Sequence, residues 1–176
     1  MRMERLSAID RLIERLYGQP IIRNVLRGEL VEQFVLDALG EGWIAAGDYE
    51  AWDVESSDGQ HRIQVKQSSA RQSWAEVDCK PSSPRFSIKA SKTWVDGQGW
   101  RGELTRHATI YVFAWHPLVD STADHRDPNQ WEFFLVHSRF LPSQNSISLN
   151  GLKELWIACG AGDLSVRIAP LLLNDK

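Results

Sequence analysis

The Asp58-Gly59 dipeptide constrains the fold of this chain more than any other feature, because it lies between "AWDVE" at 51–55 and "HRIQVKQ" at 61–67. Both flanking runs have strand character, and Asp-Gly suits the positive φ angles that a type I′ turn needs at its two central positions. We therefore expect a β-hairpin with a two-residue loop at 58 and 59. A one-residue change in loop length would turn the side chains to the opposite face, so this loop sets the register.

That register pairs Val54 with Ile63 and Asp53 with Gln64. Directly opposed residues point to the same face of a sheet, with Cβ atoms about 4.5 to 5.5 Å apart. Since side chains alternate along a strand, Lys66 falls on the same face as Gln64. The hairpin thus predicts a polar surface that carries Asp53, Gln64 and Lys66, with the aliphatic residues behind it.

A carboxylate and an amide oxygen are hard ligands of the kind that Mg²⁺ accepts, and Mg²⁺ commonly also binds substrate phosphate. The lysine adds a cation that can offset charge on a phosphodiester and help to deprotonate an attacking water. Asp53, Gln64 and Lys66 are therefore a candidate site for metal-assisted phosphodiester hydrolysis. The alternative is a solvent-facing hairpin whose polar residues only pair across the strands.

The hydrophobic pattern of the whole chain predicts a mixed α/β domain, with helices around a central sheet. The expected helices cover residues 5–17, 22–39 and 148–157, and the expected strands cover residues 43–46, 51–55, 61–67, 85–89, 108–115, 131–137 and 164–173. The apolar stripe of the first helix should pack on the domain. A glycine-marked turn is expected at 96–102.

Length and composition indicate a single domain over residues 1–176, with an N-terminal helical extension at 1–20 and a basic insertion at 70–107. No apolar run is long enough to span a bilayer, and the charged start lacks the apolar core of a signal peptide. We therefore expect a cytoplasmic protein with no membrane partner. The two cysteines, Cys79 and Cys159, show no zinc-ligand spacing.

The net charge of −3 hides a basic middle section, because residues 61–107 hold nine Lys and Arg against four Asp and Glu. Such a segment can neutralise a phosphate backbone, and its Trp74, Trp94 and Trp100 can stack on bases. The alternative is a long loop that packs on the sheet. The candidate nucleic-acid contacts are Ser68, Arg71, Gln72, Trp74, Lys89, Lys92 and Arg101.

A helical glutamate, an aspartate on one strand and a residue-x-Lys pattern on the next resemble the PD-(D/E)XK nuclease superfamily. The "QVK" of residues 64–66 is similar to the glutamine version in the Mrr-like restriction branch, and "RGELVEQFVLDALGEGW" at 27–43 resembles the leading helix of that branch. The resemblance covers roughly residues 27–67. It implies a restriction endonuclease-like αβββαβ core, in which helices flank a central mixed sheet.

Carried over one residue at a time, the resemblance makes Asp53 the metal-binding aspartate, Gln64 the second metal ligand and Lys66 the catalytic lysine. Glu32 matches the auxiliary acid on the leading helix, which binds metal directly or through water. The backbone carbonyl of Val65 is implied as a further ligand. All four side chains are thereby assigned catalytic roles.

The sequence departs from the family pattern at two places. Trp52 stands before Asp53, where the family has proline, and Gln64 replaces the more usual acid. A neutral ligand lowers the negative charge of the site, so metal should bind more weakly than with two carboxylates. Glu29 competes with Glu32 for the helical role, since it lies one turn away.

The resemblance implies a Mg²⁺-dependent nuclease, with Mn²⁺ as a second usable ion. Its substrate would be nucleic acid, DNA before RNA, and endonuclease action is favoured over exonuclease action. The alternative is an inactive module of the same fold that binds nucleic acid or a protein partner in a defence or repair complex. A third interpretation is a non-nuclease α/β domain with a polar hairpin. A homodimer stays open, because double-strand cutting often uses two copies.

Overall fold

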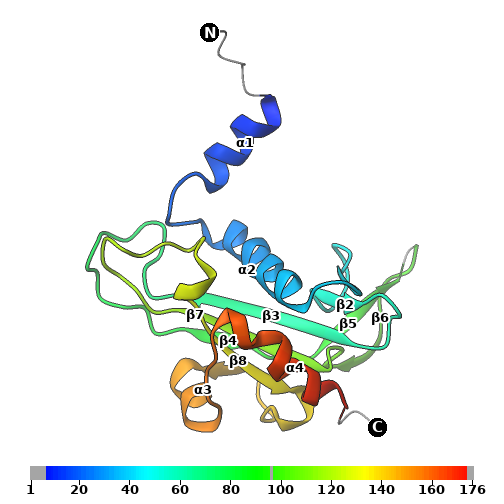
Figure 1. Cartoon of the computed structure of the whole chain (residues 1–176). Coiled ribbons are helices and arrows are strands. Elements are labelled where there is room, and N and C mark those ends of the chain that lie inside the picture. Colours follow the sequence, from blue (N-terminus) through cyan, green and yellow to red (C-terminus); the bar gives the residue numbers. More distant parts are fainter. Residues whose placement is uncertain (1–6, 96, 174–176) are drawn as a thin grey trace.

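The computed structural model of this chain describes residues 7–95 and 97–173 (Figure 1). Its α-helices are α1 (Ala8–Tyr17), α2 (Asn24–Leu39), α3 (Leu149–Leu155) and α4 (Leu164–Leu173). Its strands are β1 (Trp43–Ala45), β2 (Val54–Ser56), β3 (Arg62–Ser69), β4 (Arg85–Ser87), β5 (Ser91–Val95), β6 (Gly99–Thr105), β7 (Ile110–His116), β8 (Glu132–His137) and β9 (Ser146–Ser148). Short 3₁₀ turns are η1 (Pro128–Gln130), η2 (Ser138–Phe140) and η3 (Ala161–Asp163).

A five-stranded mixed sheet with the order β1-β2-β3-β7-β8 forms the centre of the fold. β3 and β7 pair in parallel, and the other neighbours are antiparallel. Every residue of β7 is buried, as expected for an apolar strand that is covered on both faces. The mixed α/β class predicted from the sequence is confirmed at this level.

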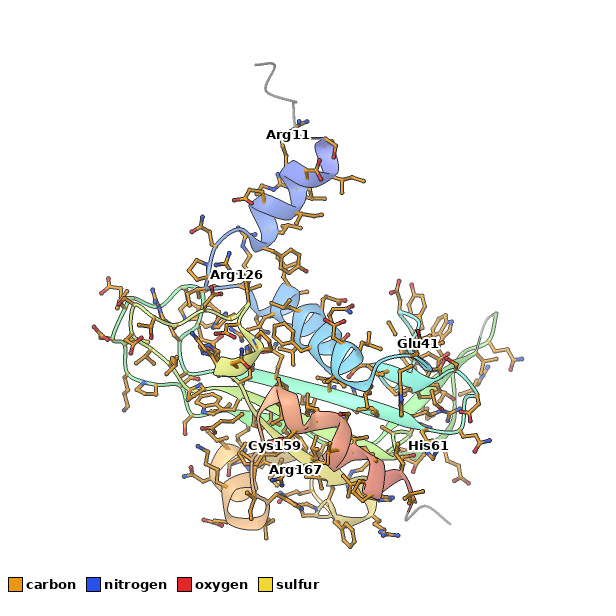
Figure 2. The ribbon with its side chains drawn as sticks, viewed as in Figure 1. Arg11, Glu41, His61, Arg126, Cys159 and Arg167 are labelled. Carbon is orange, nitrogen blue, oxygen red and sulfur yellow. The ribbon has the colours of Figure 1, made fainter. Side chains whose placement is uncertain are left out.

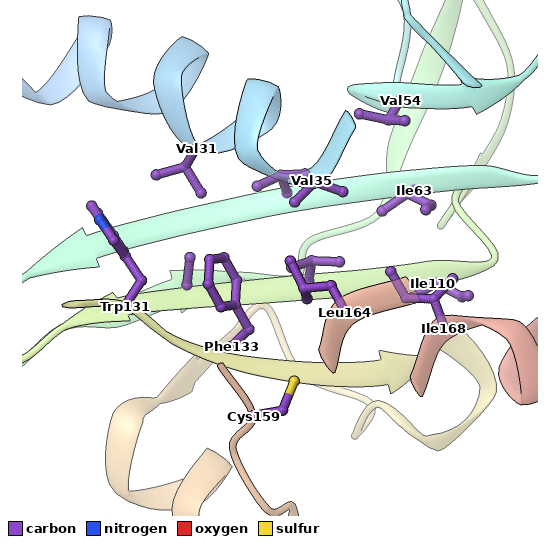
Figure 3. Packing of buried hydrophobic residues seen from close by; sticks show 13 residues of the cluster. Val31, Val35, Val54, Ile63, Ile110, Trp131, Phe133, Cys159, Leu164 and Ile168 are labelled. Carbon is purple, nitrogen blue, oxygen red and sulfur yellow. The ribbon is translucent and has the colours of Figure 1, made fainter. Parts of the chain in front are cut away.

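Two hydrophobic clusters cover the two faces of this sheet. On one face, Val31 and Val35 of α2 and Leu164 and Ile168 of α4 pack against the strands (Figure 3). On the other face, α3 and the small β4-β9 sheet contribute a second cluster that includes Phe86, Ile147 and Leu152. Since side chains alternate along β3, Ile63 and Val65 face α2, whereas Gln64 and Lys66 face the opposite layer.

Helix α1 stands away from the rest of the chain (Figure 1), so the expectation that it packs on the domain is wrong. None of its residues is buried, and Ile9 is 67% exposed. Arg126 holds only the end of the helix, donating to the carbonyls of Tyr17 at 3.3 Å and Gly18 at 3.0 Å (Figure 2). An apolar stripe indicates a helix but does not say which surface will cover it. None of the described helices is long and apolar enough to cross a membrane.

The segment 164–173 is helix α4, so the expected last strand is wrong. Leu164 and Ile168 lie four residues apart on one helical face and are fully buried. Pro170 lies inside this helix. A short apolar run cannot distinguish a strand from a buried helix by periodicity alone.

The poorly patterned segment 68–107 contains more order than the sequence indicated. Strands β5 and β6 form an antiparallel hairpin in which Trp94 pairs with Trp100. Gly97 and Gly99 have φ angles of +72° and +74°, which explains the glycines of the expected turn. Residues 5 and 6 of the expected first helix and residue 96 of this turn lie outside the described residues.

The expected register of the β2-β3 hairpin is confirmed. Val54 pairs with Ile63, and Glu55 pairs with Arg62. The Asp53 N–H donates to the carbonyl of Ile63, the residue that pairs with Val54, at 2.9 Å, so Asp53 and Val54 both oppose Ile63, as in a β-bulge. The expected pairing of Asp53 with Gln64 is thus not part of the ladder, but the two side chains still meet through a hydrogen bond.

The turn that joins these strands differs from the expected type I′ turn. Gly59 has a φ of +71°, but Asp58 does not have a positive φ. The Gly59 N–H donates to the Ser56 carbonyl at 2.7 Å, and the Ser56 N–H donates to the His61 carbonyl at 3.0 Å. The loop thus spans 57–60, as in four-residue hairpins built on a type I turn. It has the same centre as the expected two-residue loop, which is why the register survives.

Candidate functional site

Asp53 is the hydrogen-bonding centre of the candidate site. Its Oδ2 accepts from the Gln64 side-chain amide and from the backbone N–H of Val65, the latter at 2.6 Å. Within the described part of the chain, no group donates a hydrogen bond to the other oxygen, Oδ1. The carboxylate is thus fixed by β3 through one oxygen, and the other remains able to accept a further ligand.

Lys66 lies beside Asp53 and Gln64 at one wall of a pocket with a volume of about 370 Å³. The pocket lies on the face of the sheet opposite α2, because it contains the even-numbered side chains of β3. Segments before β2, after β4 and in the β5-β6 hairpin complete it. Its lining residues are Glu50, Ala51, Asp53, Gln64, Lys66, Ser87, Lys89, Ser91, Trp100 and Tyr111.

Arg62, the first polar residue of β3, has a different environment from Gln64 and Lys66. The guanidinium of Arg62 lies 3.8 Å from the centroid of a Trp52 ring, a cation-π contact. The Trp52 indole in turn donates to Glu55 at 3.0 Å. Arg62 thus stabilises the hairpin, and Gln64 and Lys66 are the β3 residues that line the pocket.

Glu32 approaches the same carboxylate from α2. It follows Val31, which is fully buried against the sheet (Figure 3), and its own side chain is half-buried. It does not line the 370 Å³ pocket, but its charge interacts with that of Asp53. Glu29, the alternative acid, is exposed.

The charges at the site are mutually coupled. Burial, together with the carboxylates of Asp53 and Glu29, raises the pKa of Glu32 to about 7, although Lys66 opposes the shift. Burial also raises the pKa of Asp53, against the lowering effects of Lys66 and of the hydrogen bonds from Val65 and Gln64. The coupling places Glu32, Asp53 and Lys66 within electrostatic range of one another.

The donor set is suited to a hard divalent cation. Two neighbouring carboxylates and an amide oxygen are oxygen ligands, and the raised pKa values indicate two acids that lack sufficient positive charge. In the structure the Gln64 amide turns its N–H toward Asp53, so its oxygen reaches the same place only after rotation of the amide. Residues 7–95 and 97–173 contain no group of three His, Cys, Asp or Glu placed to hold a metal ion.

Arg27 fixes the position of α2 on β3 and was not identified from the sequence. It is fully buried, and burial lowers the pKa of its guanidinium to about 10. Its Nε donates to Gln67 Oε1 at 2.6 Å, and its Nη2 donates to Asn24 at 2.8 Å and Gln72 at 3.1 Å. Because Glu32 is on the same helix, this network helps to set its distance from Asp53. An arginine in an amphipathic helix gives no sequence signal of burial.

Some of the expected nucleic-acid contacts lie near the site. Lys89 lines the 370 Å³ pocket, and Lys92 lines an adjoining hollow of about 510 Å³. Ser68 is on β3 on the same face as Lys66, and Arg101 is exposed on β6. The β4-β5 connection and the β5-β6 hairpin thus bring two of these cations to the entrance of the site.

Other expected contacts lie beyond the carboxyl end of β3. Gln72 accepts from Arg27 and donates to the Ser69 carbonyl at 2.7 Å, a structural role. Arg71 donates to the Asp120 carbonyl at 3.2 Å. Trp74 is 78% exposed in the loop after β3 and lines neither hollow. The structure does not place these three with Asp53.

Tyr111 was not identified from the sequence as a residue of the site. It is opposite Gln64 in the parallel β3-β7 pairing and lines the pocket. Burial raises the pKa of its phenol. Its strand was expected, but a single sequence does not reveal the register of two distant parallel strands.

Comparison with known proteins gives no family to set beside this geometry: no protein-family model and no curated protein matched the sequence. The site itself has a lysine, an amide and a carboxylate that line one pocket, and a second carboxylate, Glu32 of α2, whose charge interacts with that of Asp53.

Proposed function

We propose that this protein is a divalent-metal-dependent nuclease of the PD-(D/E)XK type, acting on DNA. The observation that carries the proposal is that Asp53, Gln64 and Lys66 line one pocket, where the Gln64 amide donates to Asp53. Glu32, half-buried on α2, interacts with the same carboxylate through its charge. These are the side chains that the family resemblance assigned to catalysis. They come from helix α2, strand β3 and the segment that precedes β2, so their meeting depends on the fold.

Asp53, Glu32 and the Gln64 amide oxygen would hold the cation, and Mg²⁺ or Mn²⁺ would supply charge stabilisation at the phosphate and a more acidic water. Lys66 would offset the negative charge of the phosphodiester in the pocket and orient the attacking water. Asp53 remains fixed throughout by the Val65 N–H at 2.6 Å. Glu32, whose pKa of about 7 lies near neutral pH, can hold or release a proton at its carboxylate.

A second function is favoured by one observation. The Gln64 amide donates to Asp53 and thereby satisfies this carboxylate without a cation. A site that remains in this state would bind nucleic acid without hydrolysing it. Such a protein would be a catalytically inactive member of the same fold in a defence or repair complex.

Cleavage of plasmid and linear DNA with Mg²⁺, with Mn²⁺ and with a chelator separates the two functions. We expect cleavage by the wild type only with a divalent ion, and its loss in Lys66→Ala and in Asp53→Ala. Lys80→Ala is the matched control, because Lys80 is exposed and does not line the pocket. Equal cleavage by all four proteins would contradict the proposed site, and binding without cleavage by the wild type would favour the second function.

A further inference from the structure

The candidate site continues into a second hollow past the β5-β6 hairpin. The 370 Å³ pocket at Asp53 and the adjoining hollow of about 510 Å³ share four lining residues, Ser87, Lys89, Ser91 and Trp100. Each volume is of the size that holds one small organic ligand. Because the shared residues border both hollows, Trp100 lies between them, on the path of any chain that leaves Asp53 in this direction.

Trp100 is held in place by other rings. It packs edge-on against Trp94, with ring centroids 5.6 Å apart and planes at 77°. Tyr49 stacks on Trp94 at 5.3 Å, and Tyr49 belongs to the segment that leads into β2. The aromatic wall, meaning Tyr49, Trp94 and Trp100, thus connects the hairpin to the strand that follows Asp53. Despite this support, the Trp100 side chain remains 53% exposed.

Lysines border the hollows on both sides of this indole. Lys66 and Lys89 line the first hollow, and Lys89 and Lys92 line the second. Leu104, 65% exposed, gives the second hollow an apolar surface. Alternating cations and exposed apolar groups suit a ligand that alternates phosphates with flat apolar rings.

We infer that these hollows bind an unpaired stretch of nucleic acid, with one base stacked on Trp100 and its flanking phosphates at Lys89 and Lys66. A base in a duplex is covered on both faces by its neighbours, so an indole gains stacking energy only from an unpaired base. The inference rests on the proposed function for the identity of the ligand, and adds that the substrate is single-stranded at the site.

Binding measured in the presence of a chelator tests this without cleavage. The probes are labelled strands of about 12 nucleotides, a length within the usual single-strand site size. They comprise a deoxy strand, a ribo strand of the same sequence, an abasic deoxy strand and a blunt hairpin duplex. The wild type should bind both base-containing strands more tightly than the abasic strand or the duplex.

Trp100→Leu should weaken binding of the base-containing strands about 5- to 100-fold and leave the abasic strand and the duplex unchanged. Trp100→Phe should fall between the wild type and the leucine variant. Trp74→Leu, which removes an exposed indole outside both hollows, should bind like the wild type. Unchanged binding by Trp100→Leu, or tighter binding of the duplex than of the single strands, would overturn the inference.

If Trp100→Leu unfolds the hairpin, a second variant decides. Lys89→Gln should reduce the slope of the logarithm of affinity against the logarithm of salt concentration by about 0.7, the value for one phosphate of a single strand. Lys80→Gln should leave the slope unchanged, and an unchanged slope in both variants would contradict the assignment.

The two proposals fail separately. Trp100-dependent binding of single strands by a protein that cleaves nothing supports this inference and overturns the proposed hydrolysis. If cleavage depends on Asp53 and Lys66 but binding does not depend on Trp100, the proposed hydrolysis is supported and this inference is overturned. Whether the ribo or the deoxy strand binds better identifies the sugar, and either result supports the inference when it depends on Trp100.

Discussion

Gln64 and Asp53 are joined across the β2-β3 hairpin by a hydrogen bond from Gln64 Nε2 to Asp53 Oδ2. The amide is thus the neutral partner of a half-buried carboxylate in the structure, and would be a ligand of the proposed cation only after it turned its oxygen inward. Rotation of the Gln64 amide would thus convert the metal-free state of the proposed site into its metal-bound state.

Gln64→Glu is expected to tighten Mn²⁺ binding by roughly tenfold, because cation affinity rises with the number of charged ligands. In chelator the same variant should melt at a lower temperature than the wild type, since three acids would then share the site. Titration calorimetry and thermal unfolding measure the two effects. Gln60→Glu is the control, because Gln60 is exposed in the hairpin loop, and an equal change in both variants would contradict the role of Gln64.

Glu32→Gln should raise the melting temperature in chelator at pH 8 more than at pH 5. The pKa of Glu32 is raised from 4.5 to about 7, so between these values the folded chain binds more protons than the unfolded chain. Stability therefore falls as pH rises through this window, and the glutamine removes that loss. We expect the rise in melting temperature at pH 8 to exceed the rise at pH 5 by about 2 to 4 °C. Glu29→Gln, an exposed acid one turn away, should change the melting temperature less.

Arg27→Leu should lower the free energy of unfolding by about 2 to 4 kcal/mol. The substitution leaves Gln67, Asn24 and Gln72 without the donor that they share. Arg27→Lys keeps the charge but lacks the planar fork, so it should restore only part of the loss. Denaturant unfolding of the three proteins measures this. A lysine variant as stable as the wild type would show that charge alone matters.

His125 should make the fold sensitive to acid. Its Nδ1 accepts from the Ile22 N–H at 3.0 Å, so Nε2 carries the proton toward Ser69 Oγ at 2.8 Å. Burial, with Arg27 and His116 nearby, lowers the pKa of the imidazole from 6.5 to about 3. Unfolding between these values takes up a proton, so stability is lost as pH falls from about 6.5 toward 3.

Denaturant unfolding between pH 7 and pH 4 tests this expectation. His125→Asn should be less stable than the wild type at pH 7, because it loses the two buried contacts. Its stability should also fall less steeply toward pH 4. Parallel curves for the two proteins would contradict a neutral, buried His125 in the native state.

The sequence predicted the central hairpin, its register and helix α2, because each has a strong local signal. The Asp-Gly turn, the alternation of Ile63 and Val65 and the apolar stripe of α2 depend on residues close together in the chain. The turn type was predicted wrongly, but the strand register did not change, because the expected loop at 58–59 and the observed loop at 57–60 have the same centre. The alternation along β3 places Gln64 and Lys66 on one face, and hydrogen bonds from Gln64 and Val65 bring the Asp53 carboxylate to them.

What the sequence could not predict depends on contacts between distant segments. The burial of Arg27 needs the amides of β3 and of the loop after it, and Tyr111 reaches the pocket only through the parallel pairing of β3 with β7. The sequences of helix α4 and of the β5-β6 hairpin show only a weak periodicity of apolar residues. Trp100 lines the same pocket as Asp53 because the β5-β6 hairpin folds back toward it.

The rate at which the isosteric variant Asp53→Asn cleaves DNA under single-turnover conditions with Mg²⁺ tests the central claim most directly. The asparagine has the shape of the aspartate but lacks the charge that a cation requires, and burial of Asp53 already disfavours its charged form in the absence of metal. The fold should therefore persist, as judged by an unchanged thermal unfolding transition in chelator. We predict a rate at least about 100-fold below that of the wild type. A folded Asp53→Asn protein that cleaves at the wild-type rate would contradict the assignment of this site to phosphodiester hydrolysis.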